Sequence, residues 1–123
     1  MPWELTPDRP IYIQLTEQIE LKICAGIYPR GSKMPPVREM AREASVNPNT
    51  MQRALAGLEE SGLLFTIRTS GRFVTKDEKL VKQVKQRLAR EHVRKFLDRM
   101  HRLGFDYEEI LAALSKLAKE NGN

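Results

Sequence analysis

Five polar side chains are gathered in one short stretch of the chain: Asn47, Asn49, Thr50, Gln52 and Arg53. Asparagine and glutamine amides can form paired hydrogen bonds with adenine, an arginine guanidinium can do so with guanine, and a threonine hydroxyl suits either base. The stretch therefore predicts a surface that reads DNA bases. Asn47 has a plainer alternative, because an asparagine that precedes a proline is also a typical helix N-cap.

Two further groups of side chains could bind the DNA backbone. Arg38 lies at the start of a predicted short helix, where its guanidinium and the free N–H groups of the helix could hold a phosphate. The predicted hairpin tip contains Arg68, Ser70, Gly71 and Arg72, and a glycine there lets the backbone approach a sugar-phosphate edge or a minor groove. The alternatives are a solvated arginine and an ordinary polar turn.

Hydrophobic periodicity predicts the elements that must position these side chains. Isoleucine or leucine recurs every four residues from Ile11 to Ile23, which predicts an amphipathic helix over 10–27. Glycines and prolines then predict a linker over 26–35, because the residue before a proline avoids the helical region. A short helix is expected over 37–44.

The segment 45–75 completes a recognisable order of elements. A tight turn precedes a helix over 48–61, with Asn47 as its cap and with Met51 and Leu55 facing inward. From residue 63 the period changes to two, and a glycine near residue 71 turns the chain, so a small β-hairpin is expected. Helix, short helix, turn, helix and hairpin form the order of a winged helix-turn-helix, which we predict over residues 1–75.

Residues 76–123 are predicted to form a two-helix dimerisation region. A stretch without glycine or proline predicts one long helix over 76–102, and Asp106 can cap a last helix. Two helices alone cannot bury both of their apolar faces, so we expect this region to pack on a second copy of the chain. The residues assigned to that contact are Leu88, Phe96, Leu97, Met100, Leu111 and Leu114. The expected fold is mainly α with a small β-hairpin.

Composition narrows the class of protein. The chain has 123 residues, with Lys+Arg 21 against Asp+Glu 16 and a net charge of +5, which favours polyanionic partners. One cysteine and no apolar run long enough for a signal peptide or a membrane span favour a cytoplasmic protein without a membrane partner. An enzyme is not expected, because His92 and His101 are nine residues apart rather than four, and there is no glycine-rich phosphate loop. No catalytic residue, metal site or cofactor is predicted.

One alternative function remains open at this point. A helical adaptor could bind protein or RNA through its basic surface without sequence-specific recognition of DNA. RNA recognition usually needs exposed aromatic side chains on a sheet, and Phe65 and Phe73 are better explained as core residues. This alternative is therefore weaker than binding to duplex DNA.

Six blocks in a fixed order resemble the GntR-type transcriptional regulators, in particular their short YtrA-like branch. The blocks are Pro10-Ile11-Tyr12-Ile13-Gln14-Leu15, Gly26-Ile27-Tyr28-Pro29-Arg30-Gly31, Met34-Pro35-Pro36-Val37-Arg38-Glu39-Met40-Ala41, Val46-Asn47-Pro48-Asn49-Thr50, Leu58-Glu59-Glu60-Ser61-Gly62-Leu63-Leu64 and Gly71-Arg72-Phe73-Val74. The resemblance implies a winged helix-turn-helix that binds operator DNA as a homodimer, usually as a repressor.

The resemblance also implies roles for individual residues. The family's phosphate-binding arginine falls on Arg38, and its wing-tip contact falls on Gly71 with Ser70 beside it. The contacts of its recognition helix fall on Asn47, Asn49, Thr50 and Gln52. The sequence departs from the branch at Thr69, where a second wing glycine is common. In the short branch the C-terminal region is a dimerisation element, so an effector site, which the sequence does not identify, would lie at the dimer interface.

Overall fold

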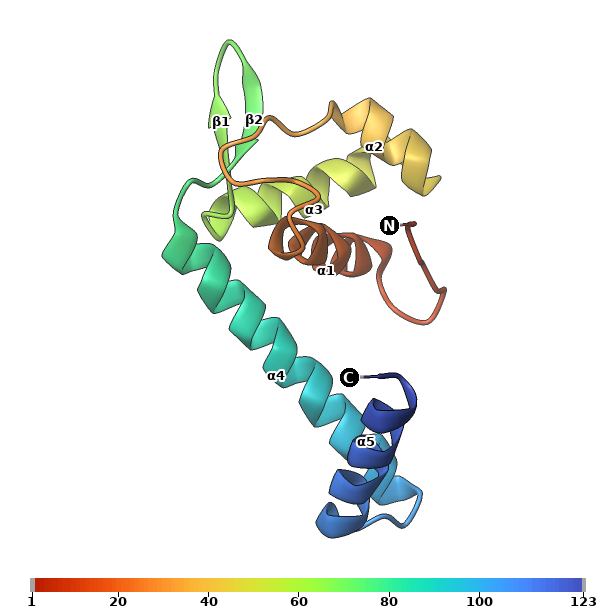
Figure 1. Ribbon diagram of the computed structural model, residues 1–123. Coiled ribbons are helices and arrows are strands. Elements are labelled where there is room, and N and C mark those ends of the chain that lie inside the picture. The colour runs from red at the N-terminus through yellow and green to blue at the C-terminus, as the bar shows by residue number, and fades with distance from the viewer. Residues whose placement is uncertain (1, 123) are drawn as a thin grey trace. The chain divides into compact units, whose positions relative to one another are not determined.

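The computed structural model describes residues 2–122 as five helices and one two-stranded antiparallel sheet (Figure 1). The predicted mainly helical fold with one hairpin is confirmed. The elements are α1 (Ile11–Cys24), α2 (Val37–Ala44), α3 (Pro48–Glu60), β1 (Leu64–Ile67), β2 (Gly71–Val74), α4 (Glu78–Arg102) and α5 (Tyr107–Glu120). Packing divides the chain into a first unit that ends at Gln86 and a second unit that begins at Arg87. This division lies within α4, whereas the domain division predicted at residue 75 follows the secondary structure.

Two helix boundaries differ from the predicted ones for local reasons. α1 ends at Cys24 rather than near residue 27, because Gly26 adopts a φ of 79° and turns the chain. α4 begins at Glu78 rather than at residue 76. The Asp77 carboxylate accepts hydrogen bonds from the backbone N–H groups of Lys79 (3.0 Å) and Leu80 (3.3 Å). Asp77 is therefore an N-cap that was not predicted from the sequence.

The core of the first unit is built around α3, which packs against α1, α2 and β1. Leu15 and Ile19 of α1 and Met40 of α2 are fully buried. Met51 and Leu55 of α3 are also buried, so their predicted inward positions are confirmed. Because these side chains must stay buried, α3 cannot rotate about its own axis. The same residues of α3 therefore always face solvent.

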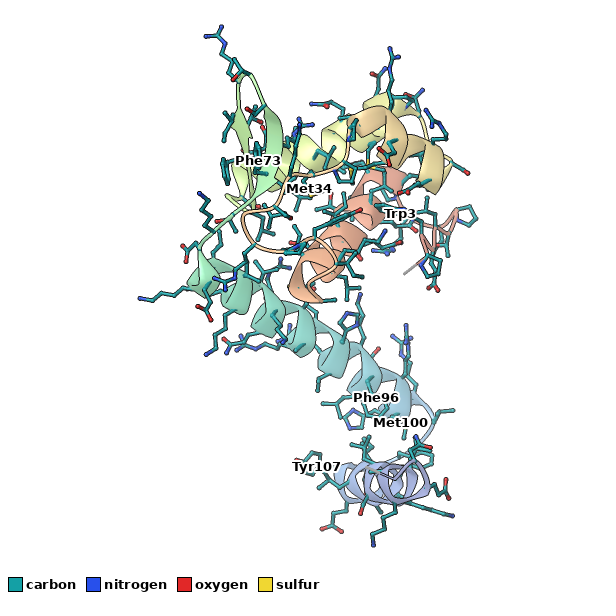
Figure 2. All side chains as sticks on the ribbon, turned by 45° about the horizontal axis from the view of Figure 1, so that its top comes forward. Trp3, Met34, Phe73, Phe96, Met100 and Tyr107 are labelled. Carbon is teal, nitrogen blue, oxygen red and sulfur yellow. The ribbon has the colours of Figure 1, made fainter. Side chains whose placement is uncertain are left out.

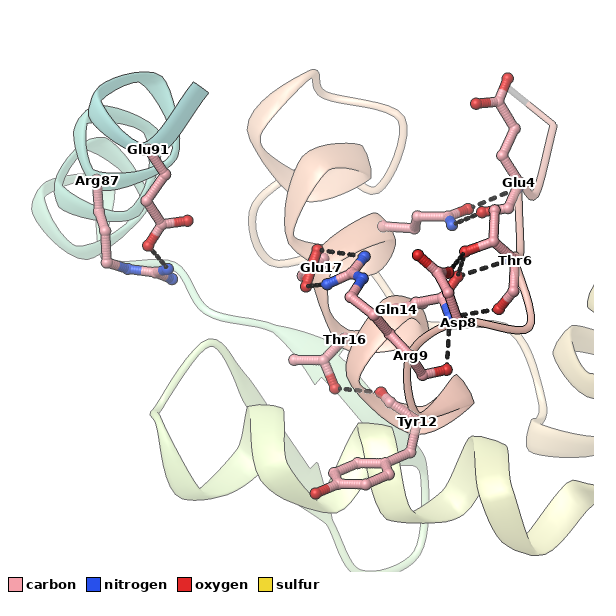
Figure 3. Close-up of polar contacts among 11 residues, drawn as sticks. Glu4, Thr6, Asp8, Arg9, Tyr12, Gln14, Thr16, Glu17, Arg87 and Glu91 are labelled. Atoms are coloured by element: carbon pink, nitrogen blue, oxygen red, sulfur yellow. Dashed lines mark hydrogen bonds and ion pairs between the residues drawn. The ribbon is translucent and has the colours of Figure 1, made fainter. Parts of the chain in front are cut away.

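The N-terminal segment is held on α1 by two glutamine side chains (Figure 3). Gln14 accepts from the backbone N–H of Thr6 (2.8 Å) and donates to the carbonyl of Thr6 (2.7 Å). Gln18 makes the same reciprocal pair with the backbone of Glu4. The ammonium group of Lys22 then lies 3.4 Å from the centre of the Trp3 ring, and burial lowers the pKa of Lys22.

The linker before α2 lies beside the hairpin as a third stretch of backbone. β1 pairs with β2 in the register Leu64 to Val74, and the cross-strand pair Phe65 and Phe73 stacks with ring centres 5.7 Å apart. The linker was predicted only as a loop, yet it runs along the free edge of β2. There the N–H of Met34 donates to the carbonyl of Arg72 (2.8 Å), and the linker lies next to Phe73 (Figure 2).

The second unit consists of the C-terminal part of α4 and α5. The carboxylate of Asp106 accepts from the N–H of Glu109 (2.9 Å), and the Glu109 side chain accepts from the N–H of Asp106 (3.0 Å). This capping box confirms the predicted start of the last helix. Ile110 is buried, and Figure 2 shows Phe96 and Met100 on the side of α4 that faces α5. Within residues 2–122, no helix is long and apolar enough to span a membrane.

Candidate nucleic-acid interface

The N-terminus of α3 is formed by Asn47 and Pro48. The preceding turn places Ser45 in the left-handed region (φ 57°), and the Oδ1 atom of Asn47 accepts from the N–H of Asn49 at 2.7 Å. Pro48 occupies the first helical position, where a missing N–H costs nothing. The capping interpretation of Asn47 is therefore confirmed. The residue is exposed.

The exposed face of α3 carries the other predicted base-reading residues. Asn49, Gln52 and Arg53 are exposed, and Thr50 is half-buried. The Arg53 guanidinium lies 3.7 Å from the centre of the Tyr12 ring of α1. A guanidinium over an aromatic ring keeps its charge and is attracted to the ring face, which limits the positions that the side chain can take. Tyr12 therefore restricts Arg53 to one side of α3, a role that the sequence analysis did not assign.

Two further exposed cations lie at the start of α2 and on the linker. Arg38 is the second residue of α2 and is exposed, as its predicted role requires. Lys33, which was not among the predicted site residues, is also exposed and lies on the linker beside the hairpin. Its proximity to the hairpin depends on a long-range backbone pairing, so the only signal in the sequence was a cation shortly before Arg38.

The hairpin tip is made of Arg68, Thr69 and Ser70, all exposed. The N–H of Ser70 donates to the carbonyl of Ile67 at 2.9 Å, which closes the turn. Gly71 has a φ of 112°, and a Cβ atom on it would lie 3.2 Å from Cε of Lys33. Gly71 is thus required by its backbone conformation, whereas the flexible end of the Lys33 side chain needs to shift by only a few tenths of an ångström to make room for a Cβ atom.

Arg72 does not flank the hairpin tip as predicted. It lies within β2 opposite Thr66, and its side chain is 17% exposed. Its Nε atom donates to Glu59 Oε1 of α3 at 2.6 Å, and its Nη1 atom donates to Gln52 Oε1 at 3.2 Å. The hydrogen bond from the Thr66 hydroxyl, together with that from Arg72, lowers the pKa of Glu59 against the opposing effect of burial.

A hollow of about 400 Å³ separates the linker from the hairpin. It is lined by residues 33–37 and by Thr66, Ser70, Gly71 and Arg72. The hollow opens beside the first turn of α2, close in sequence to Arg38. Among residues 2–122, no group of three or more His, Cys, Asp or Glu side chains could hold a metal ion. The arrangement offers hydrogen-bond donors and cations for a polyanion rather than a constellation for catalysis.

The residues predicted for dimerisation divide into two sets. Phe96, Leu111 and Leu114 are 36%, 48% and 47% exposed, and Leu97 and Met100 are half-buried. Leu88 is only 7% exposed, so it belongs to the buried residues of a single chain and offers little surface to a partner. Five further residues of the second unit with large exposed side chains were not predicted: Val93, Leu103, Phe105, Tyr107 and Leu117.

Comparison with known proteins identifies the family. Residues 11–74 match the family described as "Bacterial regulatory proteins, gntR family". The chain belongs to the GntR family. It is 37% identical over 106 residues to the uncharacterized HTH-type transcriptional regulator YhcF of Bacillus subtilis, an alignment that covers 86% of this chain and 88% of that protein. The HTH-type transcriptional repressor YtrA of Bacillus subtilis is 30% identical over 82% of this chain and 78% of its own length.

Solved structures support the same assignment. A GntR family transcriptional regulator from Listeria monocytogenes superposes with a TM-score of 0.83 and 36% identity, over 91% of this chain and 98% of that one. The DNA-binding domain of AraR in complex with operator ORX1 matches with a TM-score of 0.52 and 26% identity, over 61% of this chain and 99% of that one. This GntR protein is therefore a DNA-binding transcriptional regulator with a winged helix-turn-helix, not an enzyme, and its predicted resemblance to the YtrA-like branch is confirmed.

Proposed function

We propose that this GntR protein represses transcription in the cytoplasm by binding, as a homodimer, to an operator with two-fold symmetry. The observation that carries the proposal is the exposed set Asn49, Gln52 and Arg53 on an α3 whose opposite face is buried. Two relatives support it: YtrA is named a repressor, and the AraR domain was solved on operator DNA. A protein- or RNA-binding adaptor is less favoured, because Phe65 and Phe73 stack on each other and are half-buried.

In this proposal the N-terminal half of α3 enters a major groove. Asn49, Gln52 and Arg53 then face base edges, while Arg38, Lys33 and the hairpin tip with Arg68 lie over the backbone on either side. Two copies related by a two-fold axis would place their half-sites about one helical turn, ~10 bp, or a multiple apart.

The second unit supplies the reason for a dimer. Its exposed apolar side chains on α4 and α5, among them Phe96, Leu111 and Leu114, form helical stripes that a single copy does not cover. Large exposed apolar side chains gathered in one region favour an interaction site there. A second copy of the same region is the simplest partner, because both stripes are then covered by one symmetric contact.

The test is selection of bound sequences from a random pool of duplex DNA at near-physiological salt. We expect an inverted repeat. Recovery of unrelated sequences would overturn sequence-specific recognition. A single recovered half-site would keep recognition but overturn the dimer.

The proposed backbone contacts have their own readout. Arg38→Ala should weaken binding to all duplexes and reduce the dependence of log K on log salt by about one phosphate contact. Lys33→Ala should do the same if the hollow beside the hairpin receives a phosphate. A salt dependence that stays unchanged in either variant removes that residue from the interface.

A further inference from the structure

Arg72 connects the hairpin to two positions of α3. Gln52 and Glu59 are seven residues apart, so they lie on the same face of the helix, two turns from each other. Arg72 reaches both, with Nε on Glu59 (2.6 Å) and Nη1 on Gln52 (3.2 Å). Its side chain is 17% exposed, whereas a phosphate contact needs an accessible guanidinium. Two of the three guanidinium nitrogens, Nε and Nη1, are therefore engaged within the protein itself.

Glu59 holds the Arg72 side chain in this position. Its Oε1 atom accepts from both Arg72 and the Thr66 hydroxyl. Hydrogen bonds between an arginine and an ionised carboxylate are stronger than those between neutral groups and fix the planar guanidinium in orientation. β1, β2 and α3 are thus joined by one polar cluster that consists of Gln52, Glu59, Thr66 and Arg72.

The hydrogen bond from Arg72 determines the orientation of the Gln52 amide. Such an amide has an oxygen that accepts and a nitrogen that donates, and its network of hydrogen bonds decides which way round it lies. Arg72 can only donate, so it selects the oxygen of Gln52 and leaves the NH2 group for the exposed side of α3. An unanchored glutamine could present either atom to a base.

From this geometry we propose that Arg72 is a positioning residue, which fixes the Gln52 amide so that Gln52 presents an N–H donor to the DNA. The inference rests on the proposed function, in which Gln52 faces a base edge. A donor suits the major-groove acceptors, which are N7 of a purine, O6 of guanine and O4 of thymine. Cytosine presents its N4 amino group there, a second donor, and is rejected. Arg72 therefore acts on specificity without touching the DNA.

The experiment compares variants of the full chain on sequences selected by the wild-type protein. Gln52→Ala first identifies the operator position that Gln52 reads, as the position at which preference disappears. Arg72→Gln should then reduce discrimination against cytosine at that same position on the order of tenfold. Preference at other positions and the dependence of affinity on salt should stay as in the wild type. Gln52→Ala combined with Arg72→Gln should lose nothing further at that position.

Arg68→Gln is the matched control, since it makes the same substitution at the exposed hairpin tip. It should weaken all sequences together and make the salt dependence shallower. If Arg72→Gln behaves like Arg68→Gln, Arg72 is a backbone contact and the inference is overturned while the proposed function stands. If the wild-type protein selects no sequence, the proposed function itself fails.

A second variant covers the possibility that Arg72→Gln does not fold, which far-UV circular dichroism would show. Glu59→Gln keeps the shape of the cluster but removes the charge that holds Arg72 in place. It should relax the same operator position in the same direction. An unchanged preference at that position in folded Glu59→Gln would overturn the inference.

Discussion

In the first unit, apolar side chains are buried within one chain, whereas in the second unit most of them face solvent. Among residues 2–122, 15 of the 17 buried hydrophobic residues lie before Arg87, and eight of the 12 exposed large hydrophobics lie after Gln86. The first unit therefore buries most of its large apolar side chains within one chain, and the second leaves an apolar surface that the proposed second copy would cover. In the proposed function, the first unit binds DNA and the second unit supplies the contact between the two copies.

The largest effect is expected from removal of a buried side chain in the first unit. Leu55 of α3 is 1% exposed, so Leu55→Ala should lower the free energy of unfolding by about 3 kcal/mol, within the ~2–5 kcal/mol typical of such cavities. Chemical denaturation followed by circular dichroism measures it. Leu117→Ala in α5, where the side chain is 54% exposed, is the comparison and should cost much less in a dilute, monomeric sample. Equal losses in the two variants would contradict the contrast between the units.

A charge on the exposed stripe of the second unit should separate the two copies. Burial of one leucine at the contact contributes roughly 1.5–3 kcal/mol to the free energy of dimerisation. In a symmetric dimer the substitution is present in both copies, so the effect is counted twice. Leu114→Asp should therefore raise the dissociation constant of the dimer by about a hundredfold or more. Analytical ultracentrifugation over a range of concentrations measures the change.

Lys116→Asp is the control for that variant, because Lys116 is an exposed polar residue of the same helix. It introduces the same aspartate away from the apolar stripe, so dimerisation should persist. If the wild-type protein sediments as a monomer at micromolar concentration, the proposed homodimer is wrong.

Local signals account for what the sequence predicted well. Prolines, a four-residue apolar repeat and the pair Asn47-Pro48 act over a few residues, so the helices, the cap of α3 and the buried Met51 and Leu55 could be predicted. The direction of Arg72 could not, because it depends on the register that places Arg72 opposite Thr66 and on the approach of α3 to the hairpin. Lys33 was missed for the same reason. Local patterns position elements, and long-range pairing decides which side chains are left for a ligand.

The two helix caps provide a smaller, matched test of the same contrast. Asn47 caps α3 in the first unit and Asp106 caps α5 in the second. Asn47→Ala and Asp106→Ala should each cost about 1 kcal/mol in their own helix. Asn47→Ala should lower the stability of the first unit whatever the protein concentration. Asp106→Ala should mainly weaken dimerisation, because α5 carries the exposed stripe. The ultracentrifuge and thermal melts at two concentrations distinguish these results, and a concentration-dependent loss in Asn47→Ala would contradict the division of roles.

The smallest effect is expected from acid, and it concerns the polar cluster that joins the hairpin to α3. Hydrogen bonds from Thr66 and Arg72 hold the pKa of Glu59 below its ordinary value, although burial opposes them. A carboxylate with a lowered pKa in the folded state stabilises the fold above its unfolded pKa, about 4.3 for glutamate, and loses that contribution as the pH falls through the folded value. The wild type should thus melt at a higher temperature than Glu59→Gln at pH 7, and the difference should shrink below pH 4.3.

Glu91→Gln, from the exposed ion pair with Arg87 in α4, is the control and should change the melting temperature less at pH 7. A difference between wild type and Glu59→Gln that stays constant from pH 7 to pH 3 would mean that the shape of Glu59, and not its charge, holds the hairpin to α3.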